Sequence, residues 1–136
     1  MRSLILCLAL AGVVISALSL RVHYSNATEP CDINTHWDCG VVNHSSYAVI
    51  LHIPVAVVGI AGYLALAALA FMGWRFPLFL AALAGLGFAL RLSFIEEYVL
   101  QVWCLYCVIS QCIIALLALL SLAWLSSEHI ALKRAH

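Results

Sequence analysis

Four long apolar segments constrain the fold of this 136-residue chain more than any other feature. They run over residues 3–20, 49–73, 76–95 and 102–125. A transmembrane helix needs about 20 predominantly apolar residues, and a backbone in lipid must satisfy its hydrogen bonds internally. The sequence therefore predicts an all-α membrane protein, a single domain over residues 1–136 built as a bundle of four transmembrane helices.

The composition supports this class and argues against others. Apolar residues make up 66% of the chain and charged residues only 9%, whereas soluble proteins are roughly 45–50% apolar and about 25% charged. The formal net charge is zero. Since binding to nucleic acid depends on a positive surface, we expect membrane lipid as a partner and no nucleic acid.

Basic residues near the ends of the segments predict the orientation. The side of a membrane protein that carries most Lys and Arg normally faces the cytoplasm. If the N-terminus is cytoplasmic, Arg21 falls outside and Arg91 lies within the third segment, near its outer end. Four basic residues then lie inside: Arg2, Arg75, Lys133 and Arg134. This topology places the polar segment 23–48 outside, where we expect a redox loop that contains a short helix.

One pair of cysteines opens the fourth segment. Cys104 and Cys107 form a Cys-x-x-Cys motif, and a cysteine at a helix N-terminus has its thiolate favoured by the helix dipole. This spacing predicts redox chemistry at the membrane edge. A structural disulfide and a share in a metal site are the alternatives.

The second pair lies in the polar loop. Cys31 and Cys39 are eight residues apart, and the predicted topology brings them to the same face of the membrane as the first pair. A loop dithiol can reach both a soluble protein and a second dithiol, as thiol–disulfide exchange requires. The alternatives are a permanent disulfide that only stabilises the loop, and a metal site that uses the neighbouring His36 and Asp38.

Two polar residues in apolar segments are candidate ligand contacts. Gln111 follows Cys104 by seven positions and Cys107 by four, so we expect all three on one helix face. His52 lies near the outer end of the predicted second span, where a polar group is costly and often functional. It can either hydrogen-bond to a ligand or contact lipid headgroups.

Together these features resemble the vitamin K epoxide reductase family. The resemblance covers nearly the whole chain and includes four predicted spans. The motifs that carry it are Cys31-Asp32-Ile33-Asn34, Cys39 eight positions after the first cysteine, Ser45 six positions further on, and Cys104-Leu105-Tyr106-Cys107. Ile53-Pro54, ahead of the second span, is similar to the bacterial branch.

The resemblance implies a function. In that family a four-helix bundle holds a quinone, of the ubiquinone or menaquinone/vitamin K type, beside the Cys-x-x-Cys. It implies that Cys104 and Cys107 are the redox centre, with Cys107 closest to the quinone. It also implies that Cys31 and Cys39 carry electrons from a partner, and that Ser45 lies near the quinone. Bacterial members oxidise thioredoxin-fold proteins that introduce disulfides.

Some positions depart from the family pattern. Gln111 stands where vertebrate members have a tyrosine, and an apolar residue near Val55 stands where they have an asparagine. Gly40-Val41 replaces a frequent Ser-Arg after the second loop cysteine. The glutamine amide can still donate a hydrogen bond. These changes affect the expectation of vitamin K epoxide activity more than that of quinone use.

The sequence thus predicts a membrane thiol:quinone oxidoreductase. Electrons would pass from a thioredoxin-fold partner, a separate protein because the chain ends at His136, through both cysteine pairs to quinone, with Ser45, Gln111 and His52 orienting the quinone. The expected location is the bacterial inner membrane, with the redox site facing the periplasm, or the endoplasmic reticulum membrane in a eukaryote. The alternatives are a vitamin K quinone or epoxide reductase working in the reducing direction, a metal-binding membrane protein and a structural membrane subunit.

Overall fold

The computed structural model describes residues 1–28 and 30–136, so one residue of the predicted loop 23–48 lies outside the described part. Four helices are long and apolar enough to cross a membrane. They are α1 (Arg2–Tyr24), α3 (Val55–Met72), α4 (Arg75–Ile95) and α5 (Leu105–Ala135). The prediction of an all-α, four-helix membrane protein is confirmed.

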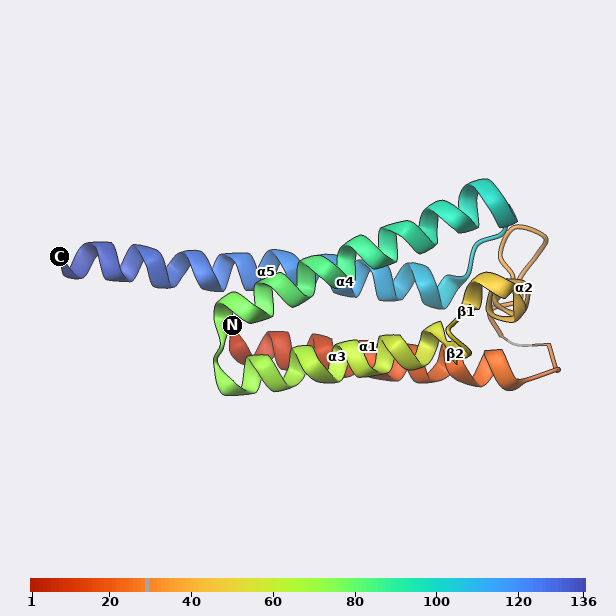
Figure 1. The fold of residues 1–136 in the computed structure, drawn as a ribbon, viewed down its shortest axis with the longest axis horizontal. Coiled ribbons are helices and arrows are strands. Elements are labelled where there is room, and N and C mark those ends of the chain that lie inside the picture. The colour runs from red at the N-terminus through yellow and green to blue at the C-terminus, as the bar shows by residue number, and fades with distance from the viewer. Residues whose placement is uncertain (29) are drawn as a thin grey trace.

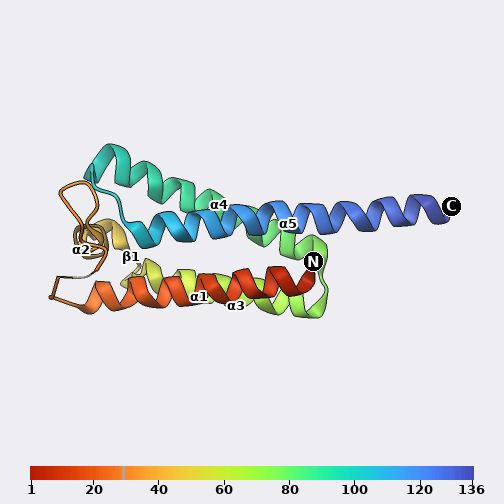
Figure 2. The same cartoon turned by 180° about the vertical axis from the view of Figure 1, so that it is seen from behind.

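The long helices form an elongated bundle (Figures 1 and 2). In both views α1 lies alongside α3, and α4 crosses close to α5. Both termini lie toward one end, and the short helix α2 (Cys39–His44) lies at the other. The bundle core consists mainly of Ile5, Ala9, Tyr63, Leu66, Ala70, Leu78, Ala82, Ile113, Ile114, Leu117 and Ala118.

A glycine allows α1 and α3 to pack closely. A Cβ atom at Gly12 would lie 2.4 Å from two ring atoms of Tyr63, so the aromatic ring occupies the space that a side chain would need. The Tyr63 hydroxyl donates a hydrogen bond to the backbone oxygen of Ser110 in α5, at 2.8 Å. Tyr63 therefore links three of the four long helices.

The second long helix begins later than the sequence predicts, at Val55 instead of residue 49. The preceding residues form a hairpin of two short antiparallel strands, β1 (Val49–Ile50) and β2 (Ile53–Pro54). Its turn residues, Leu51 and His52, have φ angles of 50° and 67°, outside the helical region. Pro54 then occupies the N-cap position, where its missing N–H is not needed.

The fourth long helix ends later than predicted, at Ala135 instead of residue 125. The residues from Glu128 onward, which follow the predicted segment 102–125, are helical too, because Ala, Leu, Lys, Arg and Glu are strong helix formers in water as well. Near this end the Arg75 guanidinium lies 4.8 Å from the ring centroid of Trp124 and 3.7 Å from the carboxylate of Glu128. These contacts join the α3–α4 turn to α5.

Short elements lie at the opposite end, near the two cysteine pairs. The Asp38 side chain caps α2 by accepting a hydrogen bond from the Val41 amide at 3.0 Å. After α2 comes a 3₁₀ turn, η1 (Ser46–Ala48), and α4 is extended by a π-helical turn, η2 (Glu96–Leu100).

Candidate redox site and cavity

Cysteines that are far apart in the sequence gather in one buried cluster beside α2. Cys31 and Cys39 form a disulfide, with their Cα atoms 5.8 Å apart. The Sγ atom of Cys104 lies 3.4 Å from that of Cys39, and both residues are fully buried. The structure thus places the disulfide of the outer pair directly against a free thiol of the inner pair.

A backbone bridge between Trp37 and Trp103 aligns the two cysteine segments. The amide of Asp38 donates to the carbonyl of Trp103 at 3.0 Å, and the amide of Trp103 donates to the carbonyl of His36 at 2.7 Å. The Trp103 indole N–H also donates to the Glu97 carboxylate at 2.8 Å. Because these contacts flank Cys39 and Cys104 directly, they hold the two sulfurs in register.

Cys104 lies just ahead of the helix, at its N-cap. Its backbone is extended, and its sulfur accepts a hydrogen bond from the Cys107 amide at 3.4 Å. The hydrogen bond from the Cys107 thiol, aided by the Cys107 and Tyr106 amides, lowers the pKa of the Cys104 thiol. Burial and the carboxyl of Glu96 act in the opposite direction but are outweighed. Cys104 is therefore the thiol most readily ionised for attack on a disulfide.

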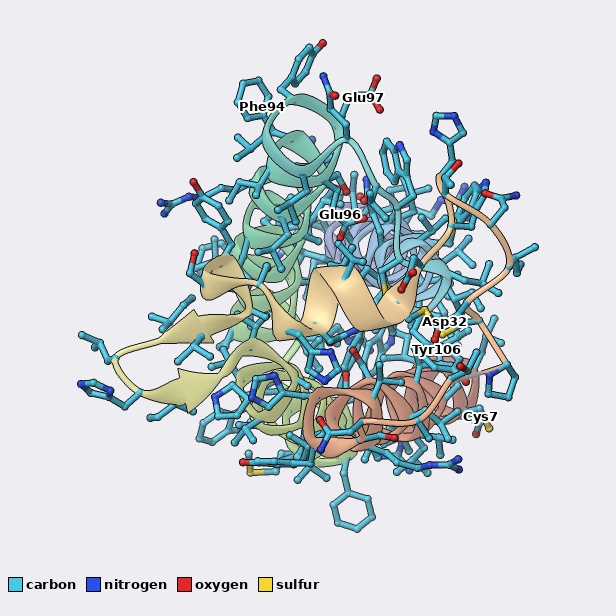
Figure 3. The ribbon with its side chains drawn as sticks, turned by 90° about the vertical axis from the view of Figure 1, so that its right-hand side faces the viewer. Cys7, Asp32, Phe94, Glu96, Glu97 and Tyr106 are labelled. Carbon is cyan, nitrogen blue, oxygen red and sulfur yellow. A yellow bond between two sulfur atoms is a disulfide. The ribbon has the colours of Figure 1, made fainter. Side chains whose placement is uncertain are left out.

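Glu96 is a buried acid at this site. Only 3% of the residue is exposed, and its carboxyl accepts a hydrogen bond from the Cys104 amide at 3.1 Å. Figure 3 shows Glu96 pointing toward the interior, whereas the adjacent Glu97 points outward. Adjacent residues of a helix point to different sides, so one of the two carboxyls is buried and the other is exposed.

A cavity of about 410 Å³ extends from the cluster into the bundle. This volume lies within the range of small-molecule sites, roughly 300–1,000 Å³. The walls are mostly apolar and come from all four long helices. Cys107 borders the cavity, and the polar residues in its lining are Ser16, Ser19, Asn43, Ser45, Tyr47, Tyr63, Ser93, Glu96, Tyr106 and Ser110.

The predicted ligand contacts have different positions relative to this cavity. Ser45 lines it, and its hydroxyl donates to the Val42 carbonyl at 2.7 Å. Among the described residues, neither Gln111 nor His52 belongs to the lining. Gln111 instead accepts a hydrogen bond from Ser93, which does line it. His52 is exposed in the hairpin turn, because the helix in which it was expected begins three residues later.

Sequence reasoning missed most polar residues of the site, among them Asn43, Tyr63, Glu96 and Ser110. Tyr63 and Ser110 also share a side-chain hydrogen bond of 2.7 Å at the cavity wall. The sequence signal for Tyr63 is a tyrosine in the middle of an apolar segment. Asn43 belongs to an Asn-His-Ser glycosylation pattern, but only 6% of this residue is exposed and its amide is engaged in the cluster.

Redox chemistry suits this arrangement. Within residues 1–28 and 30–136 there is no group of three His, Cys, Asp or Glu side chains that could hold a metal ion. What the cluster does offer is a disulfide, a neighbouring thiol with a lowered pKa and a second thiol that borders an apolar cavity. These features define a multi-pass membrane protein equipped for thiol–disulfide exchange.

Comparison with known proteins agrees with this class. The vitamin K epoxide reductase family matches residues 3–122. The chain therefore belongs to that family, and it is a membrane oxidoreductase of the quinone or epoxide reductase kind. No curated protein matches the chain.

Proposed function

We propose that this protein is a thiol:quinone oxidoreductase that supports disulfide-bond formation. It would take two electrons from a separate thioredoxin-fold protein through Cys31 and Cys39, and pass them through Cys104 and Cys107 to a quinone. The observation that carries the proposal is the 3.4 Å contact between the Cys39 and Cys104 sulfurs. This contact joins a disulfide near the aqueous end to a dithiol that borders the cavity.

The contact also indicates which loop cysteine reacts with the inner pair. A reduced partner dithiol first converts the Cys31–Cys39 disulfide to two thiols and becomes a disulfide itself. The Cys39 thiolate then attacks Cys104 in the inner disulfide and displaces Cys107 as a thiolate. Cys31 attacks Cys39 next, which restores the outer disulfide and releases Cys104. Two electrons and two protons have then moved to the inner pair, the redox state seen in this structure.

The cavity residues fit a quinone. Apolar side chains would surround its ring and tail. The wall also contains the hydroxyls of Ser45, Tyr63 and Ser110, which would turn from their present hydrogen bonds within the protein to donate to a quinone oxygen. A bound quinone would accept the two electrons and two protons that the inner dithiol releases when it forms a disulfide. Cys107 borders the cavity and its thiol hydrogen-bonds to the Glu96 carboxyl. Glu96 can therefore take the proton from Cys107 and hold it beside the cavity.

Gln111 would act on the quinone through Ser93, whose hydroxyl it holds at the cavity wall. His52 is exposed and is not among the described residues that line the cavity, so we assign it to the membrane surface instead. We place the redox end outside the cytoplasm, in the periplasm of a bacterium, because Arg2, Arg75 and the basic C-terminus lie toward the opposite end.

The test is quinone-dependent oxidation of a reduced thioredoxin-fold protein by the purified protein in detergent. Loss of absorbance by the quinone reports electron transfer, and thiol titration reports the partner. We expect Cys107→Ala and Cys39→Ala to abolish turnover. Cys112→Ala, on an exposed part of α5, is the matched control and should retain full activity. Full turnover by Cys107→Ala would disprove the relay.

A further inference from the structure

The side chain of Asn43 lies between the two cysteines that exchange. Its Nδ2 donates one hydrogen bond to the carbonyl of Cys39 at 2.9 Å and another to Cys104 Sγ at 3.6 Å. Only 6% of Asn43 is exposed. Asn43 thus brings a buried side-chain amide into contact with a reacting sulfur.

The neighbours fix which way the amide points. The Cys39 carbonyl can only accept a hydrogen bond, so the nitrogen of Asn43 must face it and, with it, the sulfur of Cys104. On the other side, Ser19 of α1 donates to Asn43 Oδ1 at 2.8 Å. Both partners are buried. An amide flip would set Oδ1 against the Cys39 carbonyl, two acceptors with no proton between them, so the N–H is held toward the sulfur.

We propose that Asn43 is a catalytic residue of the sulfur exchange, whose amide stabilises negative charge on the Cys104 sulfur. This inference rests on the proposed relay. In exchange between Cys104 and the outer disulfide, the thiolate charge of one sulfur spreads over the attacking, central and leaving sulfurs. A fixed N–H donor favours a charged sulfur more than a neutral one, and it does so without reorganisation.

The chemistry also explains a polar side chain at such a buried position. A leucine of similar size would fill the same space beside Val42 and the cysteines without any desolvation cost. An asparagine there must bury its amide, which is compensated only because each polar atom has a partner. The sulfur of Cys104 is the partner with a chemical role.

The exchange can be measured without quinone or partner protein. In a Cys107→Ser variant that retains the Cys31–Cys39 disulfide, the Cys104 thiolate attacks Cys39, forms a Cys39–Cys104 disulfide and releases the Cys31 thiolate. A mass-tagged maleimide added after a denaturing acid quench counts the rearranged species by peptide mapping. The rate as a function of pH then reports the ionisation of Cys104, with Glu96 unchanged in every variant.

We expect Asn43→Leu to slow the exchange about tenfold and to shift its pH inflection upward by about one unit, as the loss of a hydrogen bond to a charged group predicts. Asn43→Asp keeps the size of the side chain and the approach to Ser19, but its carboxylate repels the thiolate. It should be slower still at neutral pH. Asn26→Leu, at an exposed position of the same outer segment, is the matched control and should leave rate and inflection unchanged.

Two results would overturn the inference. The first is an unchanged rate and inflection in both Asn43 variants while the parent exchanges normally. The second is a parent that forms no Cys39–Cys104 disulfide, which would refute the relay as well. If Asn43→Leu loses its thermal unfolding transition, the isosteric Asn43→Asp decides: slower exchange with an intact transition supports the role.

Discussion

The contact between Gly12 and Tyr63 allows a quantitative test of how the bundle supports the cavity. Replacing Gly12 by alanine would put a Cβ atom 2.4 Å from two atoms of the tyrosine ring and 2.6 Å from a third. Nonbonded carbon atoms prefer about 3.5–4.0 Å. The ring or one of the helices must therefore move by about 1 Å or more.

The ring cannot move freely, because its hydroxyl is hydrogen-bonded to both the carbonyl and the hydroxyl of Ser110, at 2.8 and 2.7 Å. Overpacking a tight site costs about 1–3 kcal/mol, and losing a buried hydrogen bond costs about 1 kcal/mol more. Alanine also has a higher helix propensity than glycine, by about 1 kcal/mol. A comparison between two Gly→Ala changes removes most of this last contribution.

Gly87 supplies that comparison. It lies within α4, and a Cβ atom there would meet nothing within 4 Å. We expect Gly12→Ala to be less stable than Gly87→Ala by about 2–4 kcal/mol, the sum of the two costs. The free energy of unfolding can be measured by circular dichroism in mixed micelles with increasing sodium dodecyl sulfate. Since Tyr63 lines the cavity, quinone binding should weaken only in Gly12→Ala. Equal free energies of unfolding for the two variants would show that the packing of Tyr63 against Gly12 does not hold α1 against α3.

Two further predictions concern the reacting groups. The hydrogen bond from Cys107 lowers the pKa of the Cys104 thiol, so the thiolate should form at a lower pH than it does without that bond. The exchange between Cys39 and Cys104 should speed up with rising pH and then level off, and Cys107→Ala should move the inflection to higher pH. Stopped-flow rates across pH 5–10 check this, and a wild-type inflection at or above that of Cys107→Ala would contradict it. The Glu96→Gln variant keeps an acceptor for the Cys104 amide, but its side chain cannot take the proton from Cys107. Reduction of bound quinone should therefore slow about tenfold or more, while the exchange between Cys39 and Cys104 changes little. Equal loss in both steps would mean that Glu96 only holds the backbone.

Local sequence patterns predict much of the fold for a clear physical reason. A segment of about 20 apolar residues has few stable alternatives to a helix in lipid, so the four helices could be anticipated. The ends of the helices could not. Residues 49–54 are as apolar as a span, yet they pair as a hairpin, because Pro54 cannot continue a helix N-terminally and the turn adopts left-handed backbone angles.

The candidate site, like the fold, was predictable from the sequence only in part. The positions of the two cysteine pairs and the number of spans between them predict that both pairs lie near one membrane face. That Cys39 is the residue in contact with Cys104 is visible only in the folded chain, since the Trp37–Trp103 bridge between distant segments sets that register. The tertiary structure also assigned the buried polar positions to Asn43 and Glu96. Those roles depend on which neighbours surround a side chain, and a single sequence does not record contacts between residues that are about 60 positions apart.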